Sequence, residues 1–287
     1  MKWNGKLQKD EVVTGYIPIA LQSETMAQLT KPNGRRRYIV DIEKDHRTIF
    51  PSVTTEAEGM LRNFGMEKWK DAWVKRGLDK YMGRTLTTNM VTEILTSHTQ
   101  EAKASADTGT LMHQYIDKLL TGADVNDIPH QLEPAIQGFL RWRRKYIDWE
   151  HIGSELGVYS TKLSVAGTMD ALFNTPDGYM IVDWKTSRGI YESHAIQASV
   201  YAEAFRHMTG KRKLAGAMVV RFDNDYPFIL RNGVGGGARD RRKPKVFTDN
   251  VETLHLTPEV CKIYAQEIDD LRLIKSRHSR KLVKETL

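Results

Sequence analysis

Two short segments of the sequence place a carboxylate inside an otherwise largely apolar stretch. Asp170 ends the segment AGTMD at 166–170, and Asp183 lies within IVDWKT at 181–186. An ionised group in a buried strand is costly unless something pairs with it, so each carboxylate is expected to have a partner. Lys185 is a candidate partner of Asp183 because residues two apart in a strand lie on the same face.

A predicted hairpin brings the two carboxylates together. We expect strands at 163–174 and 178–186, joined by the turn Thr175-Pro176-Asp177-Gly178. Two carboxylates and one ammonium then converge. Oxygen ligands of this kind bind Mg²⁺ or Mn²⁺, and these ions activate water for phosphodiester hydrolysis. The simpler alternative is an ordinary Asp–Lys ion pair at a strand end, and for this motif alone the ion pair is favoured.

The remaining elements predict an α/β fold with a mixed sheet, because the order in the second half is helix, three strands, helix, strand. We expect N-terminal strands and a helical region over 1–105, packed on a core over 106–287 as one compact unit. The core includes a basic loop at 231–246 and a C-terminal helix. The expected strands lie at 16–21, 37–42, 152–160, 163–174, 178–186, 215–222 and 226–230, and the expected helices lie within 56–103 and at 107–121, 133–149, 193–208 and 257–275.

Composition and charge narrow the class of protein. Of 287 residues, 43 are Lys or Arg and 36 are Asp or Glu; the net charge of +7 suits a polyanion such as nucleic acid, although many soluble proteins carry it without one. The single cysteine, Cys261, excludes an internal disulfide and a four-cysteine metal site. No apolar run approaches the roughly 20 residues of a membrane span, and the N-terminus lacks the apolar stretch of a secretory signal. We therefore expect a cytoplasmic protein with no membrane partner.

The helix expected at 133–149 has aromatic residues at helical spacing. They are Phe139, Trp142, Tyr146 and Trp149, interleaved with basic residues. One interpretation is a surface on which unpaired bases stack while the basic groups contact phosphates. The other interpretation, which we favour, is a core-facing stripe with a solvated basic face.

Considered together, these segments resemble the PD-(D/E)XK nuclease superfamily. Asp170 followed by Asp183-Trp184-Lys185 resembles its D…(D/E)xK signature, and VDWKTS at 182–187 is similar to the DxKT strand of the RecB-like branch. GTLMH at 109–113 resembles the upstream GTxxH helix of that branch, and QASVY at 197–201 resembles its downstream QxxxY helix.

The resemblance implies a restriction-endonuclease-like core of helix, mixed sheet with a three-strand meander, helix and strand. It also implies that Asp170 and Asp183 hold Mg²⁺ or Mn²⁺, with His113 as a further ligand. Lys185 would orient the attacking water or stabilise the pentavalent phosphorus. The residues implied to bind DNA are Gln197, Tyr201, Thr186 and Ser187.

Glu155 is a secondary candidate, because relatives often have a glutamate on the strand before the Asp170 strand. It would contact the metal ligands without binding the metal itself, or lie near a second metal. The alternative is a plain exposed carboxylate, and the two interpretations stay equally open.

The resemblance favours a metal-dependent DNA exonuclease that hydrolyses phosphodiester bonds from DNA ends. PSVTT at 51–55 is similar to a segment of phage-type and mitochondrial-genome-maintenance exonucleases. The expected setting is phage-type recombination, replication or repair in a bacterial host cytoplasm, alone or with single-strand-binding or recombination proteins. The alternatives are a structure-selective or site-specific endonuclease, a catalytically silent DNA-binding module, and a basic α/β protein unrelated to nucleic acid.

Overall fold

The computed structural model describes residues 11–13, 26–30, 36–43, 46–60, 64–123, 125, 127–210, 212–223, 250–268 and 270. It divides into two compact units, a larger one of Met1–Met60 with Pro134–Leu287 and a smaller one of Leu61–Glu133. None of the described helices is long and apolar enough to cross a membrane. The larger unit holds both of the carboxylate segments.

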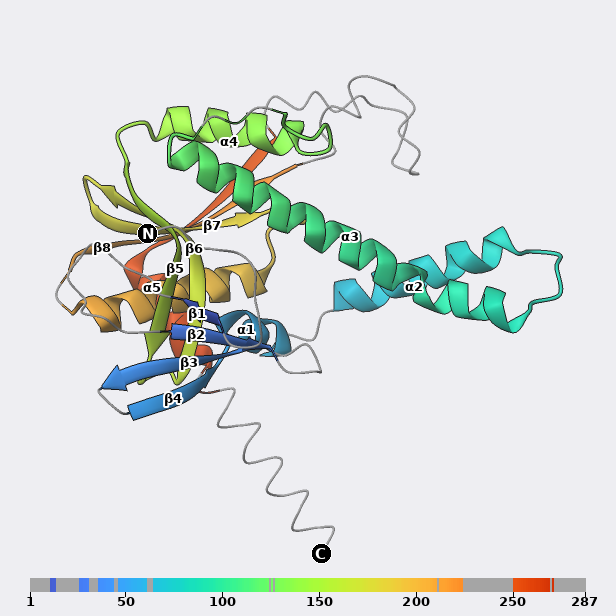
Figure 1. Cartoon of the computed structure of the whole chain (residues 1–287), viewed down its shortest axis with the longest axis horizontal. Coiled ribbons are helices and arrows are strands. Elements are labelled where there is room, and N and C mark those ends of the chain that lie inside the picture. The colour runs from blue at the N-terminus through green and yellow to red at the C-terminus, as the bar shows by residue number, and fades with distance from the viewer. Residues whose placement is uncertain are drawn as a thin grey trace, which may run out of the picture. The chain divides into compact units, whose positions relative to one another are not determined.

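The larger unit is built around a five-stranded mixed sheet (Figure 1). Its strands, in spatial order, are β5 (Glu150–Ser160), β6 (Val165–Thr175), β7 (Gly178–Lys185), β8 (Leu214–Phe222) and β9 (Val251–Leu256). β7 and β8 are parallel, and the other neighbours are antiparallel. The meander of three strands, the crossover helix α5 (Glu192–Thr209) and β8 confirm the predicted α/β core and its hairpin.

Helices cover both faces of this sheet, and strand alternation determines which side chains each helix meets (Figure 1). Trp184 of β7 contacts Phe139 and Trp142 of α4 (Glu133–Lys145), with ring centroids 5.8 and 5.0 Å apart. Tyr179 of the same strand contacts Phe205 of α5 at 5.6 Å. Residues an odd number apart in a strand point to opposite faces, so α4 and α5 pack on opposite sides. Phe139 and Trp142 are therefore part of the core, as favoured, whereas Tyr146 and Trp149 follow the end of α4 and are half-buried.

A second, four-stranded antiparallel sheet precedes a short helix. Its elements are β1 (Glu11–Val13), β2 (Met26–Thr30), β3 (Arg36–Glu43), β4 (His46–Pro51) and then α1 (Val53–Met60). Ser52, between β4 and α1, forms a parallel bridge to Ala166 at the start of β6. The Tyr38 hydroxyl of β3 lies 3.4 Å from Oγ1 of Thr168. These contacts attach the N-terminal strands to the strand that holds Asp170.

The smaller unit contains two helices, α2 (Phe64–Lys80) and α3 (Thr88–Leu120). A Cβ at Gly77 would lie 3.1 Å from the Ile94 side chain, so the two helices approach closely there. α3 begins at Thr88 rather than near Asp107, because the Thr87 hydroxyl accepts the N–H of Met90 and caps it. The helix runs through residue 105, and the division of the chain at that residue stays a prediction.

Several other expectations concern the ends of the chain. The strand expected at 37–42 is confirmed by β3, and a helix covers 258–268 within the expected 257–275. β9 was not predicted. The strands expected at 16–21 and 226–230 and the basic loop at 231–246 lie outside the described residues.

Candidate active site

Asp183 is the most deeply buried acidic group of the candidate site. It lies near the end of β7 with 0% exposure, and Nζ of Lys185 is 2.6 Å from its Oδ2. Apart from this ion pair, neither carboxylate oxygen has a hydrogen-bond partner among the described residues. The Lys185 side chain keeps 17% of its surface in contact with solvent. A buried anion with a single partner retains acceptor capacity for a further cation.

Asp170 reaches the same place from β6. The last ladder pair of β6 and β7 toward this end is Ala171 with Val182, so Asp170 and Asp183 would form the next pair. Instead, Oδ2 of Asp170 accepts the backbone N–H of Trp184 at 2.8 Å. This bond fixes the Asp170 carboxylate beside β7. The structure therefore brings Asp170, Asp183 and Lys185 together, while their catalytic roles stay proposals.

The electrostatics of this group reflect an excess of negative charge. Burial raises the pKa of Asp183 to about 7; Lys185 opposes this rise and the neighbouring Asp170 adds to it. Burial by itself would lower the pKa of Lys185, but the attraction of Asp183 and Asp170 outweighs it, and that pKa is raised. Lys185 is therefore a permanent cation at neutral pH, and the carboxylates compete for it.

Glu155 of β5 has an unusual backbone conformation, and its side chain lies close to Asp170. Its φ is 51°, in the left-handed region that non-glycine residues rarely adopt, at a cost of about 1–2 kcal/mol. A Glu155 carboxylate oxygen lies within 4.8 Å of an Asp170 oxygen. Strained residues of this kind cluster at functional sites. The structure thus places Glu155 beside a proposed ligand, and its role stays a prediction.

His113 lies on α3, in the smaller unit, and its side chain is half-buried. The helix expected over this segment is confirmed, and it is longer than expected. The role of His113 as a metal ligand stays a prediction from the resemblance.

Thr186 and Ser187 begin the loop that follows β7. The Ser187 hydroxyl donates to the carbonyl of Gly189 at 2.8 Å, and Nε of Arg221 donates to the carbonyl of Ser187. Arg221 is the register partner of Lys185 in the parallel β7–β8 pair. Its other nitrogen atoms lie 3.3 Å from Asp223 and 3.4 Å from Glu252. Arg221 was not predicted from the sequence, because a parallel register that crosses a helix leaves no local signal.

Gln197 and Tyr201 share one face of α5, as predicted, and both are buried. Nε2 of Gln197 donates to the Tyr201 hydroxyl at 3.2 Å and to Oγ1 of Thr54 in α1 at 3.4 Å. The Tyr201 ring packs against Gly167 of β6, where a Cβ would lie 2.6 Å from Cε1. Burial raises the pKa of Tyr201, so the hydroxyl stays neutral. The hydrogen bonds join α1 to α5, and the packing of the Tyr201 ring joins α5 to β6, the strand that holds Asp170. A contact of Gln197 or Tyr201 with DNA stays a prediction.

The donor set fits a hard divalent cation. Mg²⁺ and Mn²⁺ favour oxygen ligands, and the cluster offers carboxylates from Asp170, Asp183 and Glu155. The Asp183 oxygens without hydrogen-bond partners are the buried polar atoms that such an ion would satisfy. The same cluster offers no thiolate, which would favour a softer metal.

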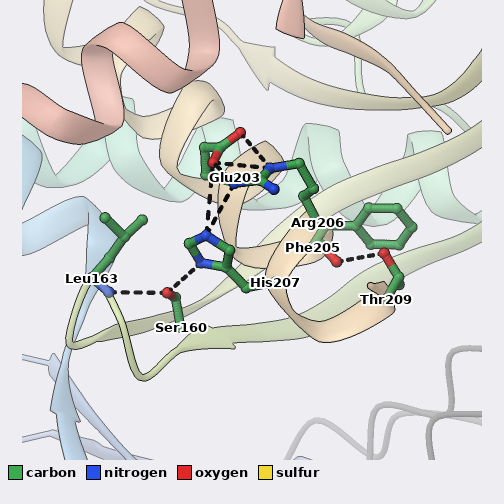
Figure 2. A network of polar contacts seen from close by, with 7 residues as sticks. All are labelled: Ser160, Leu163, Glu203, Phe205, Arg206, His207 and Thr209. Carbon is green, nitrogen blue, oxygen red and sulfur yellow. Dashed lines mark hydrogen bonds and ion pairs between the residues drawn. The ribbon is translucent and has the colours of Figure 1, made fainter. Parts of the chain in front are cut away.

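A second polar network in the larger unit lies toward the C-terminal end of α5 (Figure 2). Glu203 accepts from Arg206 at distances of 2.6 to 3.1 Å and lies 3.8 Å from Nε2 of His207. Nδ1 of His207 is 2.7 Å from the Ser160 hydroxyl. Serine, histidine and glutamate in this order suggest nucleophilic catalysis. However, Ser160 is 1% exposed and its hydroxyl accepts the N–H of Leu163 at 3.0 Å, so the network is structural.

A family model described as the PD-(D/E)XK nuclease superfamily matches residues 101–281. A search of curated protein sequences found no match. Among the solved structures that match, one titled "Crystal structure of SSO0001" is 12% identical, covers 71% of this chain and 85% of that chain, and has a TM-score of 0.28. An overlap at that TM-score supports no conclusion about function.

Proposed function

The chain belongs to the PD-(D/E)XK nuclease superfamily, and from that premise we propose that it is a metal-dependent DNA exonuclease of the RecB-like branch. Membership of the superfamily implies nuclease activity on DNA with a divalent metal. The observation that most supports the proposed site is the fully buried Asp183, held between the like charge of Asp170 and the ammonium of Lys185. The charges of the two carboxylates are not fully compensated by the single ammonium, and a divalent cation would complete that compensation.

The proposed metal ligands are Asp170 and Asp183, with Glu155 beside Asp170 and His113 as a further ligand that the resemblance implies. When bound, Mg²⁺ or Mn²⁺ would polarise a phosphoryl oxygen and lower the pKa of a coordinated water. The bond from the Trp184 N–H orients the Asp170 carboxylate. The chain therefore supplies a preformed set of oxygen ligands.

Lys185 is proposed as the group that acts on the reacting phosphate. Its ammonium lies 2.6 Å from Asp183 and its side chain is in part open to solvent, so it can donate to the attacking water or to a phosphoryl oxygen. A cation in this place stabilises the negative charge that develops in the transition state. Arg221 holds the loop directly after Lys185 and is proposed as a positioning residue.

Four residues are proposed to act on the DNA strand. Thr186 and Ser187 directly follow Lys185 and would contact the DNA backbone near the scissile phosphate. Gln197 and Tyr201 would act through Thr54 and Gly167, by fixing α1 and the Asp170 strand β6 against α5. The exonuclease assignment, the recombination or repair setting and any protein partners rest on the resemblance to end-processing relatives.

Cleavage of end-labelled linear single-stranded and duplex DNA, beside closed circles, tests this proposal. The assay is run with EDTA, Mg²⁺ or Mn²⁺ on the wild type, Asp183→Ala and Lys185→Ala. The proposal predicts metal-dependent loss of linear DNA that spares circles and is abolished in both variants. Cut circles would replace the exonuclease with an endonuclease. Binding without cleavage under either metal would indicate a catalytically silent DNA-binding module.

A further inference from the structure

Tyr191 is an aromatic side chain at the surface, six residues after Lys185 in the chain. It directly precedes α5 and is 51% exposed, whereas every other described tyrosine, tryptophan and phenylalanine side chain is buried or half-buried. A single exposed apolar side chain needs no explanation by itself. The significance of Tyr191 comes from how its ring is held and from what lies next to it.

The Tyr191 ring is held in place by His194, one turn into α5. The two ring centroids are 5.2 Å apart at an interplanar angle of 62°, and the Tyr191 N–H donates to Nδ1 of His194 at 3.2 Å. Burial lowers the pKa of His194 to about 4, and the charge of Lys185 contributes. The imidazole is therefore uncharged at neutral pH, and Nδ1 can accept the Tyr191 N–H. The exposed ring is therefore oriented before any ligand arrives, which lowers the entropic cost of binding.

The loop from Lys185 to Tyr191 is short and anchored. It spans residues 186–190, with Arg221 bonded to the Ser187 carbonyl and the Ser187 hydroxyl bonded to Gly189. Only these five residues separate Lys185 from Tyr191 in the chain. Arg188, at the middle, is exposed and forms no ion pair within the described part of the chain. An exposed guanidinium and an oriented aromatic ring thus follow the proposed catalytic lysine by three and six residues.

We propose that Tyr191 is a stacking site for one unpaired DNA base, with Arg188 on an adjacent phosphate, next to the scissile phosphate at Lys185. Aromatic rings stack on any base, so the site recognises single strands without reading sequence. A base inside a duplex is already stacked on its neighbours and does not gain from the ring. The inference rests on the proposed nuclease function, and it names the substrate of the site as a single-stranded end.

Kinetics on a short, end-labelled single-stranded oligonucleotide test the stacking site, with Tyr191→Ala, the matched control Tyr191→Phe, and the wild type. Because the ring is exposed, its removal leaves the core intact, and thermal melting checks that. Tyr191→Ala is expected to raise KM about tenfold with kcat nearly unchanged, while Tyr191→Phe stays within about twofold of the wild type. Equal KM values for all three proteins would overturn the proposal.

A single abasic position, moved one nucleotide at a time along the same oligonucleotide, locates the stacked base. The wild type is expected to lose affinity at one position near the cleaved bond, and Tyr191→Ala is expected to show no further loss there. If the abasic site and Tyr191→Ala weaken binding independently, the ring does not stack on that base and the proposal fails.

Fluorescence anisotropy of the same oligonucleotides in EDTA separates this inference from the proposed function. Absence of cleavage by the wild type with either metal would overturn the nuclease function alone. The binding difference between Tyr191→Ala and Tyr191→Phe still decides the stacking site, because stacking needs no metal. Equal anisotropy curves for these two variants would overturn the stacking site, whatever the cleavage assay shows.

Discussion

Two buried acidic side chains of the larger unit, Asp183 and Glu203, have opposite surroundings. Glu203 accepts two hydrogen bonds from Nε and one from Nη2 of Arg206, and His207 and Ser160 complete its network (Figure 2). Asp183 has one ammonium partner and a like charge beside it. The charge of Glu203 is compensated by basic partners of the same chain, whereas the charge of Asp183 is compensated only in part.

The difference shows how a buried charge that stabilises the fold can be told from one that awaits a ligand. A network whose polar groups all have hydrogen-bond partners stabilises the local fold. Here the Ser160 hydroxyl also accepts the N–H of Leu163 and so closes the turn between β5 and β6. An unsatisfied carboxylate is retained at a cost in stability, and function is the usual reason for such a cost. The predictions below test this contrast.

The largest expected effect separates the two residues by activity. Asp183→Asn should lower metal-dependent cleavage of linear DNA by at least roughly 10³-fold, because several kcal/mol of transition-state stabilisation depend on the metal. Glu203→Gln is the matched control and should stay within about threefold of the wild type. Comparable activity of the two variants in a single-turnover cleavage assay would remove the distinction.

Much of this contrast is visible in the sequence. The spacing of Asp183 and Lys185, the turn at 175–178 and the position of Asp170 predict the convergence of the three groups, and the hairpin that joins them is confirmed. These features are local, because a turn and strand alternation determine them within about 20 residues.

The features that were missed depend on long-range geometry. The left-handed backbone of Glu155, the register of Arg221 opposite Lys185 and the bonds of Gln197 and Tyr201 to Thr54 have no signature in neighbouring residues. The early start of α3 is a different failure. A threonine cap at Thr87 is a local signal, and the continuity of one helix from Thr88 to Leu120 was missed because separate helices were expected within 56–103 and at 107–121.

The second effect concerns stability. Here the substitution of Glu203, rather than that of Asp183, should be the more damaging. Glu203→Gln should lower the free energy of unfolding by about 2 kcal/mol, because charge-assisted bonds to Arg206 are lost, and the melting temperature by roughly 4–8 °C. Asp177→Asn, in an exposed turn, is the control and should leave the melting curve unchanged. An unchanged melting temperature for Glu203→Gln would show that its network is not structural.

The third effect tests the loop anchor behind Lys185. Arg221→Ala should lower kcat/KM by about tenfold, and Arg221→Lys should recover only part of it, because an ammonium cannot bond the Ser187 carbonyl, Asp223 and Glu252 together. Glu252→Gln removes the most exposed of these partners and serves as the control. Full recovery in Arg221→Lys would mean that charge alone, and not the fork of donors, positions the loop.

The fourth effect is a pH dependence of stability without metal. Because the pKa of Asp183 is raised from its usual 3.8 to about 7, the folded state holds this proton more tightly than the unfolded state. Its contribution to stability is therefore present below about pH 4 and is lost as the pH rises toward 7, by on the order of 1 kcal/mol per pH unit or less. Urea unfolding in EDTA should show this slope for the wild type but not for Asp183→Asn. Parallel pH curves for the two proteins would contradict the raised pKa.

The most direct test of the account is calorimetric titration of Mn²⁺ into the metal-free wild type, Asp183→Asn and Glu203→Gln, with no DNA present. The contrast between the two carboxylates predicts that the wild type and Glu203→Gln bind Mn²⁺ alike, and that Asp183→Asn binds at least about tenfold more weakly. Binding should also raise the melting temperature of the first two proteins. Equal Mn²⁺ affinity in Asp183→Asn, or no binding by the wild type up to about 10 mM, would contradict the assignment of this cluster as a divalent-cation site.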